Sequence, residues 1–220
     1  MKIALCFSGQ PRAYRQSYDF YRRNLLDNYD VDIYLHTWTM NEGREELLEL
    51  LKPKAYEFED HPPCDANQRY TNTPNARDYP PYNNWMMVYS TWKSSLLIEG
   101  EYDWVIRSRT DFALNRLIPF AELDRSKLYI PDEGNDQFAF GSQANMMQHM
   151  ETFTHIDEYY NNGTPFIGEA LQRANHAHFG LDKILTYFDI HHPFPPGFRN
   201  GTPHSLIRDD FLQWSHYFNK

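Results

Sequence analysis

Short apolar runs that alternate with helical segments are the feature that most constrains the fold of this chain. The run at 2–7 is almost continuously apolar, as expected for a strand buried on both faces. Further strands are predicted at 31–36, 55–58 and 104–108. The intervening segments at 17–26, 44–51 and 84–99 have apolar residues at helical spacing. This alternation predicts an α/β fold, in which a mostly parallel sheet is flanked by helices.

Two of the predicted helices allow more specific expectations. Ser17 is placed to cap the helix at 17–26, because its hydroxyl can accept from a backbone N–H of the first turn. The helix at 84–99 carries a stripe of large apolar residues, which we expect to face the core. The stripe consists of Trp85, Val88, Trp92 and Leu96.

The second half of the chain has a different pattern. Short strands are predicted at 128–130 and 137–140, and helices at 146–160 and 168–179. Gly180 is expected to end the second of these helices. Towards the end of the chain we expect a strand at 185–190, an irregular segment at 193–203 and a short helix near 210–218. A chain of 220 residues with this pattern is expected to form one domain.

Charge and composition narrow the class of partner. The formal net charge of −9 argues against a nucleic-acid partner and favours a cation, or a ligand that brings one. No apolar run approaches the roughly 20 residues of a membrane span, and no signal peptide is recognised at the start. Cys6 and Cys64 are expected to be reduced thiols. We therefore expect a cytoplasmic protein.

Polar residues follow three of the predicted strands. They lie at 8–12, at 36–38 and at 107–111. Ligands of open α/β sheets bind beyond the carboxyl ends of the parallel strands, so we expect these segments to share a site. The segment 8–12 lacks the glycine spacing of a dinucleotide-binding or P-loop motif. Its Arg12 is either a phosphate ligand or a solvated side chain.

Asp111 is the acid best placed to bind a metal ion. Mg²⁺ or Mn²⁺ bound with a diphosphate needs only one or two protein carboxylates. A literal D-x-D at Asp30 and Asp32 lies at the start of its strand, which places it at the opposite edge of the sheet. The alternative for Asp111 is an internal salt bridge to Arg107 or Arg109, which share one face of the strand.

Four segments together resemble a group of small glycosyltransferase-like proteins of bacteria, phages and large viruses. They read MKIALCFSGQPR, YDVDIYLHTW, YSTWKSSLL and YDWVIRSRTDF. The resemblance covers 1–141 and is looser at 136–146 and 168–180. It implies a single-domain, Rossmann-type fold of the GT-A class, with a nucleotide-binding half at 1–112. The acceptor half, at 113–220, would contain a smaller antiparallel portion and the C-terminal tail.

The resemblance also implies an activity. Such enzymes transfer a sugar from a nucleotide sugar, most often a UDP-sugar, to a glycan or another hydroxyl acceptor, with Mn²⁺ or Mg²⁺. Asp111 matches the last carboxylate of their D-x-D metal motif, whereas Arg109 replaces the first. A late histidine often completes the metal site, and we prefer His204 to His191 and His192, although a surface role explains it equally well. The residues assigned to the nucleotide are Ser8, Gly9, Gln10, Arg12, Thr37, Tyr89, Lys93, Arg109 and Arg208.

Asp136 and Glu169 are the candidate general bases for an inverting transfer. Glu169 is expected in the first turn of a helix, where the dipole favours an ionised carboxylate, and stabilisation of that helix explains it equally well. A retaining mechanism needs no such base, so the stereochemistry stays open. Two other functions also stay open. One is a non-catalytic module that binds a nucleotide sugar or a carbohydrate, and the other is a sugar-nucleotide hydrolase.

Overall fold

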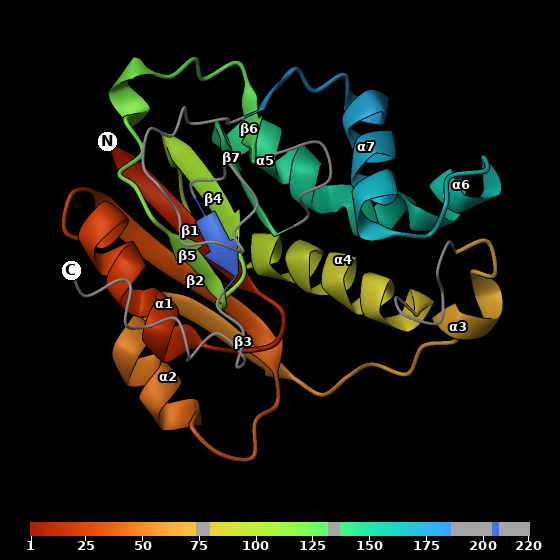
Figure 1. The fold of residues 1–220 in the computed structure, drawn as a ribbon, viewed down its shortest axis with the longest axis horizontal. Helices are drawn as coiled ribbons and strands as arrows, with labels where there is room; N and C mark the ends of the chain where they lie inside the picture. The colour runs from red at the N-terminus through yellow and green to blue at the C-terminus, as the bar shows by residue number, and fades with distance from the viewer. Residues whose placement is uncertain (74–79, 132–136, 186–203, 207–220) are drawn as a thin grey trace, which may run out of the picture.

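The computed structural model describes residues 1–73, 80–131, 137–185 and 204–206, with the backbone alone at 184–185 and 204–206. Its main sheet contains seven strands. They are β1 (Lys2–Ser8), β2 (Asp30–Trp38), β3 (Ala55–Glu59), β4 (Trp104–Ser108), β6 (Leu128–Ile130), β7 (Phe138–Gly141) and β8 (Lys183–Leu185). The order across the sheet is β3-β2-β1-β4-β7-β6-β8 (Figure 1).

Most of the neighbouring strands are parallel. β1 to β4 run in one direction, and β6 and β8 are also parallel to each other. β7 is antiparallel to both of its neighbours, β4 and β6. A separate antiparallel pair joins β5 (Phe112–Leu114) to β9 (His204–Leu206). The predicted fold class is confirmed: a mostly parallel sheet, an antiparallel portion from the second half of the chain, and flanking helices.

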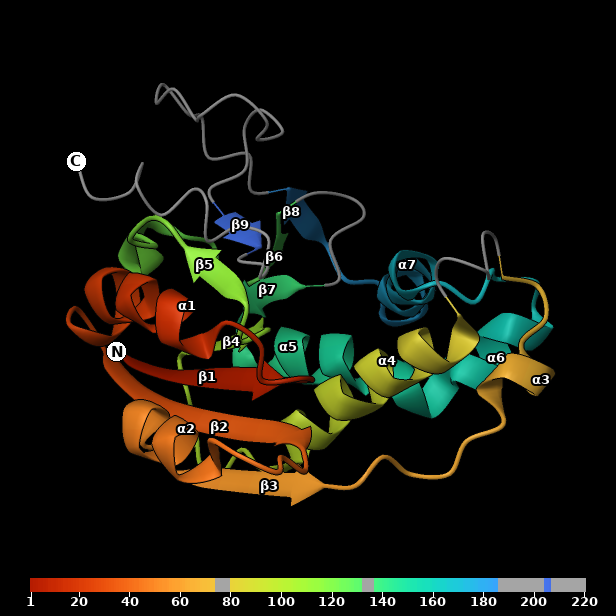
Figure 2. The ribbon, with the colours of Figure 1, turned by 60° about the horizontal axis from the view of Figure 1, so that its bottom comes forward.

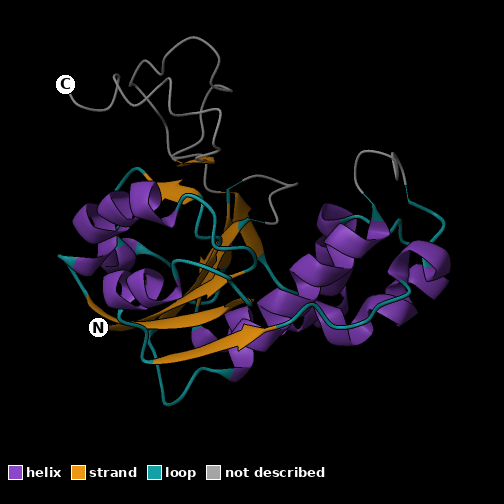
Figure 3. Ribbon diagram, turned by 90° about the horizontal axis from the view of Figure 1, so that it is seen from below, coloured by secondary structure: helices purple, strands orange, loops and turns teal. Residues whose placement is uncertain are grey.

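Helices cover both faces of the sheet. On one face lie α1 (Tyr14–Tyr21), the π-helical turn η1 (Arg22–Leu26) and α2 (Arg44–Leu51). On the other face lie α4 (Pro81–Leu96) and α5 (Gln143–Met150). The remaining helical elements are α3 (Ala66–Arg69), the 3₁₀ turns η2 (Phe120–Glu122) and η3 (Glu151–His155), α6 (Ile156–Asn161) and α7 (Gly168–Phe179). Figure 3 shows these helices on the sheet and in a cluster beyond it.

Alternation along β1 explains how one short strand serves two cores. Ile3, Leu5 and Phe7 point to the α1 and α2 face, where they join one cluster of buried side chains. Ala4 and Cys6 point to the other face, in a second cluster with α5. Such burial on both faces is typical of a central parallel strand.

Three helix predictions are wrong in detail. The first helix begins at Tyr14, after Ala13 with a φ of 46°, and the expected cap Ser17 is buried within it. The helix expected at 146–160 is broken into α5, η3 and α6. On α4, Leu96 of the apolar stripe is 58% exposed, whereas Ser90 and Ser94 are fully buried. Other predictions, such as β4, α2 and α7 with Gly180 after it, are confirmed at the same bounds.

The parallel strands end at one edge, and helices lie beyond it. In Figure 2 the tips of β1, β2 and β3 lie together, and α4 extends past them towards α3, α6 and α7. The residues expected at 186–190, 193–203 and 210–218 lie outside the described part of the chain. Among the helices described, none combines the length and hydropathy that crossing a membrane requires.

Candidate functional site

The carboxyl ends of β1 and β4 form the switch point of the sheet. The chain leaves β1 towards α1 on one face, whereas β4 is reached from α4 on the other. The segments that follow these two strands touch each other directly. The Thr110 hydroxyl donates to the carbonyl oxygens of Gln10 and Arg12, at 3.1 Å from each. Ligands of open α/β sheets bind at such a switch point, so this edge is the candidate site.

The turn after β1 is held by hydrogen bonds from β2 and α4. Gly9 has a φ of 98°, a backbone conformation that residues other than glycine rarely adopt. Its N–H donates to the Ser90 hydroxyl at 2.7 Å, and its carbonyl accepts from the Thr37 hydroxyl at 2.8 Å. The structure thus brings Ser8, Gly9 and Thr37 together, as the sequence predicts. Gln10 and Arg12 lie next in the turn and are exposed.

Arg109 and Asp111 form a bidentate ion pair just beyond β4. Nε of Arg109 lies 2.8 Å from Oδ1 of Asp111, and Nη2 lies 2.5 Å from Oδ2. The Asp111 side chain is 3% exposed and that of Arg109 is 28% exposed. Arg107 is buried, and its Nε donates to the Ser8 hydroxyl at 3.2 Å. The internal salt bridge considered for Asp111 is therefore present, with Arg109 as its partner.

This pairing bears on the metal-binding prediction. Both carboxylate oxygens of Asp111 accept from Arg109, so in this arrangement the buried acid does not present an unengaged oxygen to an ion. Asp111 as a metal ligand stays a prediction. Only the backbone of His204 is described, in β9. Asp136, His191, His192 and Arg208 lie outside the described residues.

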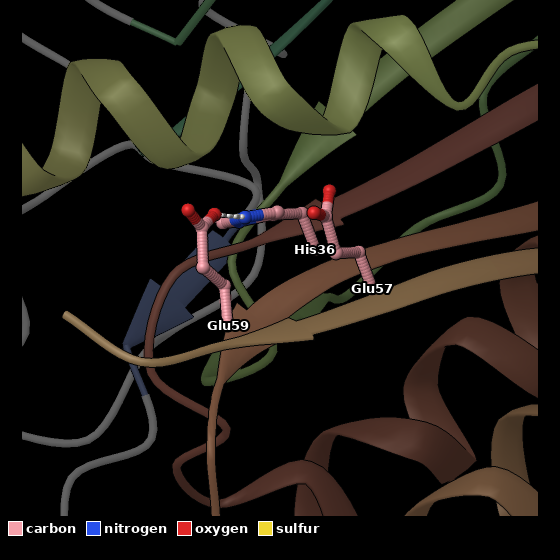
Figure 4. Close-up of side chains that lie close together, drawn as sticks. All are labelled: His36, Glu57 and Glu59. Atoms are coloured by element: carbon pink, nitrogen blue, oxygen red, sulfur yellow. Dashed lines mark hydrogen bonds and ion pairs between the residues drawn. The ribbon is translucent and has the colours of Figure 1, made fainter. Parts of the chain in front are cut away.

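A second polar group lies between the ends of β2 and β3 and the helix α4 (Figure 4). Nδ1 of His36 is 2.8 Å from the Ser90 hydroxyl, and its Nε2 is 3.0 Å from Oε2 of Glu59. The Tyr89 hydroxyl donates to Oε1 of Glu59 at 2.8 Å. His36 itself is fully buried.

Glu57 and Lys93 extend this group towards solvent. Nζ of Lys93 is 3.0 Å from Oε1 of Glu57 and 3.7 Å from Oε2 of Glu59. The register pairs His36 with Glu57, and alternation places both acids of β3 on the face that α4 covers. Tyr89 and Lys93, which the resemblance assigns to the nucleotide, therefore bind acids of the edge strand.

The hydrogen bonds define the protonation of the group. Burial lowers the pKa of His36 below its ordinary value, against the opposing effect of its bond to Glu59. Burial raises the pKa of Glu59, but the bonds from His36 and Tyr89 outweigh it, so that this pKa is lowered. A neutral ring beside an ionised carboxylate carries its proton on Nε2, which donates to Glu59. Nδ1 then accepts from Ser90.

The group can be compared with two kinds of chemical site. Ser90, His36 and Glu59 have the contacts of a nucleophile, a base and an acid, but Ser90 is fully buried and accepts from Gly9, so it is no nucleophile. His36, Glu57 and Glu59 each offer a ligand atom within 4.8 Å of the others, so they can hold a metal ion. His36 lies in the polar segment predicted at 36–38, whereas Glu57 and Glu59 were not predicted as site residues. Their spacing of two residues, at the end of the strand predicted at 55–58, was the available signal.

The acids of the literal D-x-D lie elsewhere, as predicted. Asp30 begins β2 and is exposed, at the edge opposite the switch point. Asp32 pairs with Lys54 at 2.7 Å and accepts from Tyr102 at 2.6 Å. Burial raises the pKa of Asp32, but the bonds from Lys54 and Tyr102 outweigh this effect and lower the pKa to about 2. Glu169, the other candidate base, is the second residue of α7 and is half-buried.

Comparison with known proteins identifies no family for this chain. The sequence matches no protein-family model, and no curated protein matches it.

Proposed function

We propose that this protein is a glycosyltransferase that transfers a sugar from a nucleotide sugar, with a UDP-sugar favoured, to a glycan or another hydroxyl acceptor. The observation that carries the proposal is the contact of Thr110 with the Gln10 and Arg12 carbonyls. It joins the ends of β1 and β4 at the switch point, where nucleotides bind in folds of this architecture. The sequence resemblance described above supplies the class of donor.

The charged residues of this edge suit a leaving diphosphate. Departure of a nucleoside diphosphate builds negative charge, which fixed cationic donors stabilise. Arg109 is the more exposed member of its pair, and Asp111 fixes its Nε and Nη2. In this proposal Nη1 of Arg109 and the exposed Arg12 contact the diphosphate, while Asp111 positions Arg109.

The metal of this proposal is Mn²⁺ or Mg²⁺. It would enter with the donor, take most of its ligands from phosphate and water, and neutralise charge on the leaving diphosphate. Asp111 and His204 are its proposed protein ligands. Asp111 can serve only if one of its oxygens accepts less from Arg109, because that pair occupies the carboxylate in this structure. Asp136 and Glu169 remain the proposed bases for an inverting transfer.

One observation favours a second function. The only carboxylate that the resemblance leaves in the metal motif is buried and bound to Arg109, which suits a non-catalytic module that binds a nucleotide sugar. Such a module would bind UDP without turnover, and its binding would not respond to Mn²⁺. A sugar-nucleotide hydrolase would instead release free sugar whichever acceptor is present.

Calorimetry with UDP, UDP-sugars and GDP-sugars, each with and without Mn²⁺, tests the proposal. We expect UDP to bind and a UDP-sugar to be consumed faster when a suitable acceptor is added. Asp111→Asn should weaken the response to Mn²⁺, whereas the control Asp30→Asn, at the opposite edge, should not. If no nucleotide binds under any of these conditions, the proposed function is wrong.

A further inference from the structure

We propose that His36, Glu57 and Glu59 form a binding site for a divalent transition-metal ion of the Zn²⁺ type, and that the Lys93 ammonium is the cation that competes for it. The site lies on β2 and the edge strand β3, and does not involve Asp111. Its ligands are not those proposed for the metal of the nucleotide, and strand spacing puts β2 roughly 10 Å from β4. Ser90 joins the two sites, because it contacts both His36 and Gly9.

His36 and Glu59 already present ligand atoms near the spacing of a metal site. The ligand atoms of His36, Glu57 and Glu59 lie within 4.8 Å of one another, and Nε2 of His36 is 3.0 Å from Oε2 of Glu59. Ligand atoms around tetrahedral Zn²⁺ are about 3.3 Å apart, given bonds of about 2.0 Å. An ion can therefore replace the hydrogen bond between His36 and Glu59 after a shift of a few tenths of an ångström in these two side chains. The Glu57 oxygen must move in by up to about 1.5 Å, which its exposed side chain allows.

Two of the proposed ligands are held by residues that an ion would leave in place. Nδ1 of His36 faces the Ser90 hydroxyl, and Oε1 of Glu59 accepts from Tyr89. The partner of Glu57 is Lys93, the cation that the ion would displace. A metal-bound imidazole donates its other N–H to such a partner. Ser90 can accept that proton, because its own hydroxyl is 3.4 Å from the His36 carbonyl and can donate there instead. The tautomer required for binding through Nε2 is therefore satisfied by residues already in place.

The net charge of the group favours a divalent cation. Two ionised glutamates carry a charge of −2, and Lys93 supplies only one positive charge, at 3.0 Å and 3.7 Å from them. A divalent ion would neutralise both carboxylates and free the ammonium. Lys93 and the ion cannot share this position, because both need the same oxygens and carry like charge.

The ligand types select the ion, and the location gives it access. One imidazole with two carboxylates suits Zn²⁺ or Mn²⁺ better than Mg²⁺ or Ca²⁺, which prefer oxygen ligands alone. The side chains of Glu57 and Glu59 are 37% and 26% exposed. The ion can thus arrive from the solvent side of β3, while the buried His36 closes the inner side.

Calorimetric titration of the full chain with Zn²⁺, Mn²⁺ and Mg²⁺, without nucleotide, tests the inference. Wild type should bind Zn²⁺ at this site more tightly than Mg²⁺. Glu57→Gln should weaken this binding by about tenfold or more, because it removes a charged ligand. Lys93→Met should strengthen it by about tenfold or more, because it removes the competing cation but keeps the apolar stem. Thermal melts of each variant show whether it is folded.

Matched controls separate this site from the other histidines of the chain, since any accessible imidazole is a potential Zn²⁺ ligand. Glu49→Gln and Lys52→Met change the same residue types at exposed positions on and after α2, and should leave the Zn²⁺ isotherm unchanged. Equal isotherms for Glu57→Gln and Glu49→Gln would overturn the site. If Lys93→Met binds Zn²⁺ no more tightly than Lys52→Met, the proposal that Lys93 competes with the ion is wrong. Since no nucleotide is present, failure of the proposed transferase function leaves this result intact.

Discussion

Arg109 and Asp111 bind each other through two parallel contacts, Nε to Oδ1 at 2.8 Å and Nη2 to Oδ2 at 2.5 Å, at the carboxyl end of β4. The two partners differ in exposure, at 28% for Arg109 and 3% for Asp111. Because of this difference in exposure, the two residues have different roles. The buried acid anchors the arginine, and the arginine is the member that a ligand can reach.

The difference in exposure predicts unequal costs of mutation. Arg109→Gln strands a buried carboxylate and should lower the free energy of unfolding by about 3–5 kcal/mol. Asp111→Asn leaves an arginine that water can partly solvate, so we expect a smaller loss, about 1–3 kcal/mol. Urea unfolding of both variants, and of the double variant, measures this. A larger loss for Asp111→Asn than for Arg109→Gln would show that the acid does not anchor the pair.

Thr110 is predicted to act on the ligand more than on the fold. Thr110→Val keeps the shape of a buried side chain but removes the hydroxyl that holds the Gln10 and Arg12 carbonyls. Gln10 and Arg12 are exposed, so water can replace part of that bond, and we expect a stability loss of about 1 kcal/mol. UDP affinity should fall by about tenfold, because the loop that carries Arg12 is loosened. Calorimetry with UDP measures this affinity, and Thr154→Val serves as a control at an exposed position. An affinity for UDP that Thr110→Val leaves unchanged would contradict the prediction.

Two buried serines on α4 provide a matched pair of stability tests. Ser90 bonds to Gly9 and His36, whereas Ser94 donates within the helix to the Thr91 carbonyl at 2.7 Å. Ser90→Ala strands a ring nitrogen of the buried His36 and leaves the Gly9 N–H with only its 3.2 Å bond to the His36 carbonyl, so it should cost about 1–3 kcal/mol. Ser94→Ala should change stability by less than about 1 kcal/mol, since alanine favours the helix. Equal losses in urea unfolding would refute the role given to Ser90.

A buried histidine pair predicts how stability depends on pH. Nδ1 of His149 is 2.8 Å from Nε2 of His176, and both rings are buried. Burial, the neighbouring His176 and Arg107 hold the pKa of His149 well below its ordinary value. Burial and then Lys183 lower the pKa of His176 to about 4.

Because unfolded histidine has a pKa of about 6.5, the unfolded state binds more protons than the native state below that pH. Stability should therefore be constant above pH 6.5 and fall as the pH drops towards 4, by about 3 kcal/mol for His176 alone. Urea unfolding between pH 4 and 7.5 measures the slope. His176→Gln should flatten it, whereas His61→Gln, an exposed control, should not. An equal slope in His176→Gln and wild type would contradict the assignment.

The sequence predicted those parts of the fold in which apolar residues decide the structure. The strand at 104–108 is apolar at its start and buried throughout, so its pattern marks it clearly. The sheet-facing side of α4 was missed, because Ser90 and Ser94 have no apolar period and fit there through hydrogen bonds and small size. The apolar stripe chosen instead includes Leu96, which is exposed.

The candidate site was predictable in position but not in its pairings. The direction of each strand is enough to place Asp111 at the carboxyl edge of the sheet, and Asp30 and Asp32 at the opposite edge. Which arginine pairs with Asp111 depends on the turn after Ser108, and sequence spacing does not fix it. The contacts of His36 with Glu59 arise between neighbouring parallel strands, so only the register reveals them.

A crystal structure of the protein soaked with UDP and Mn²⁺ tests the central claim most directly, because it locates the nucleotide. We predict diphosphate density between the carboxyl ends of β1 and β4, within hydrogen-bond distance of Arg109 and beside the Gly9–Arg12 turn. A nucleotide bound elsewhere on the molecule, with the Arg109–Asp111 pair untouched, would contradict the account.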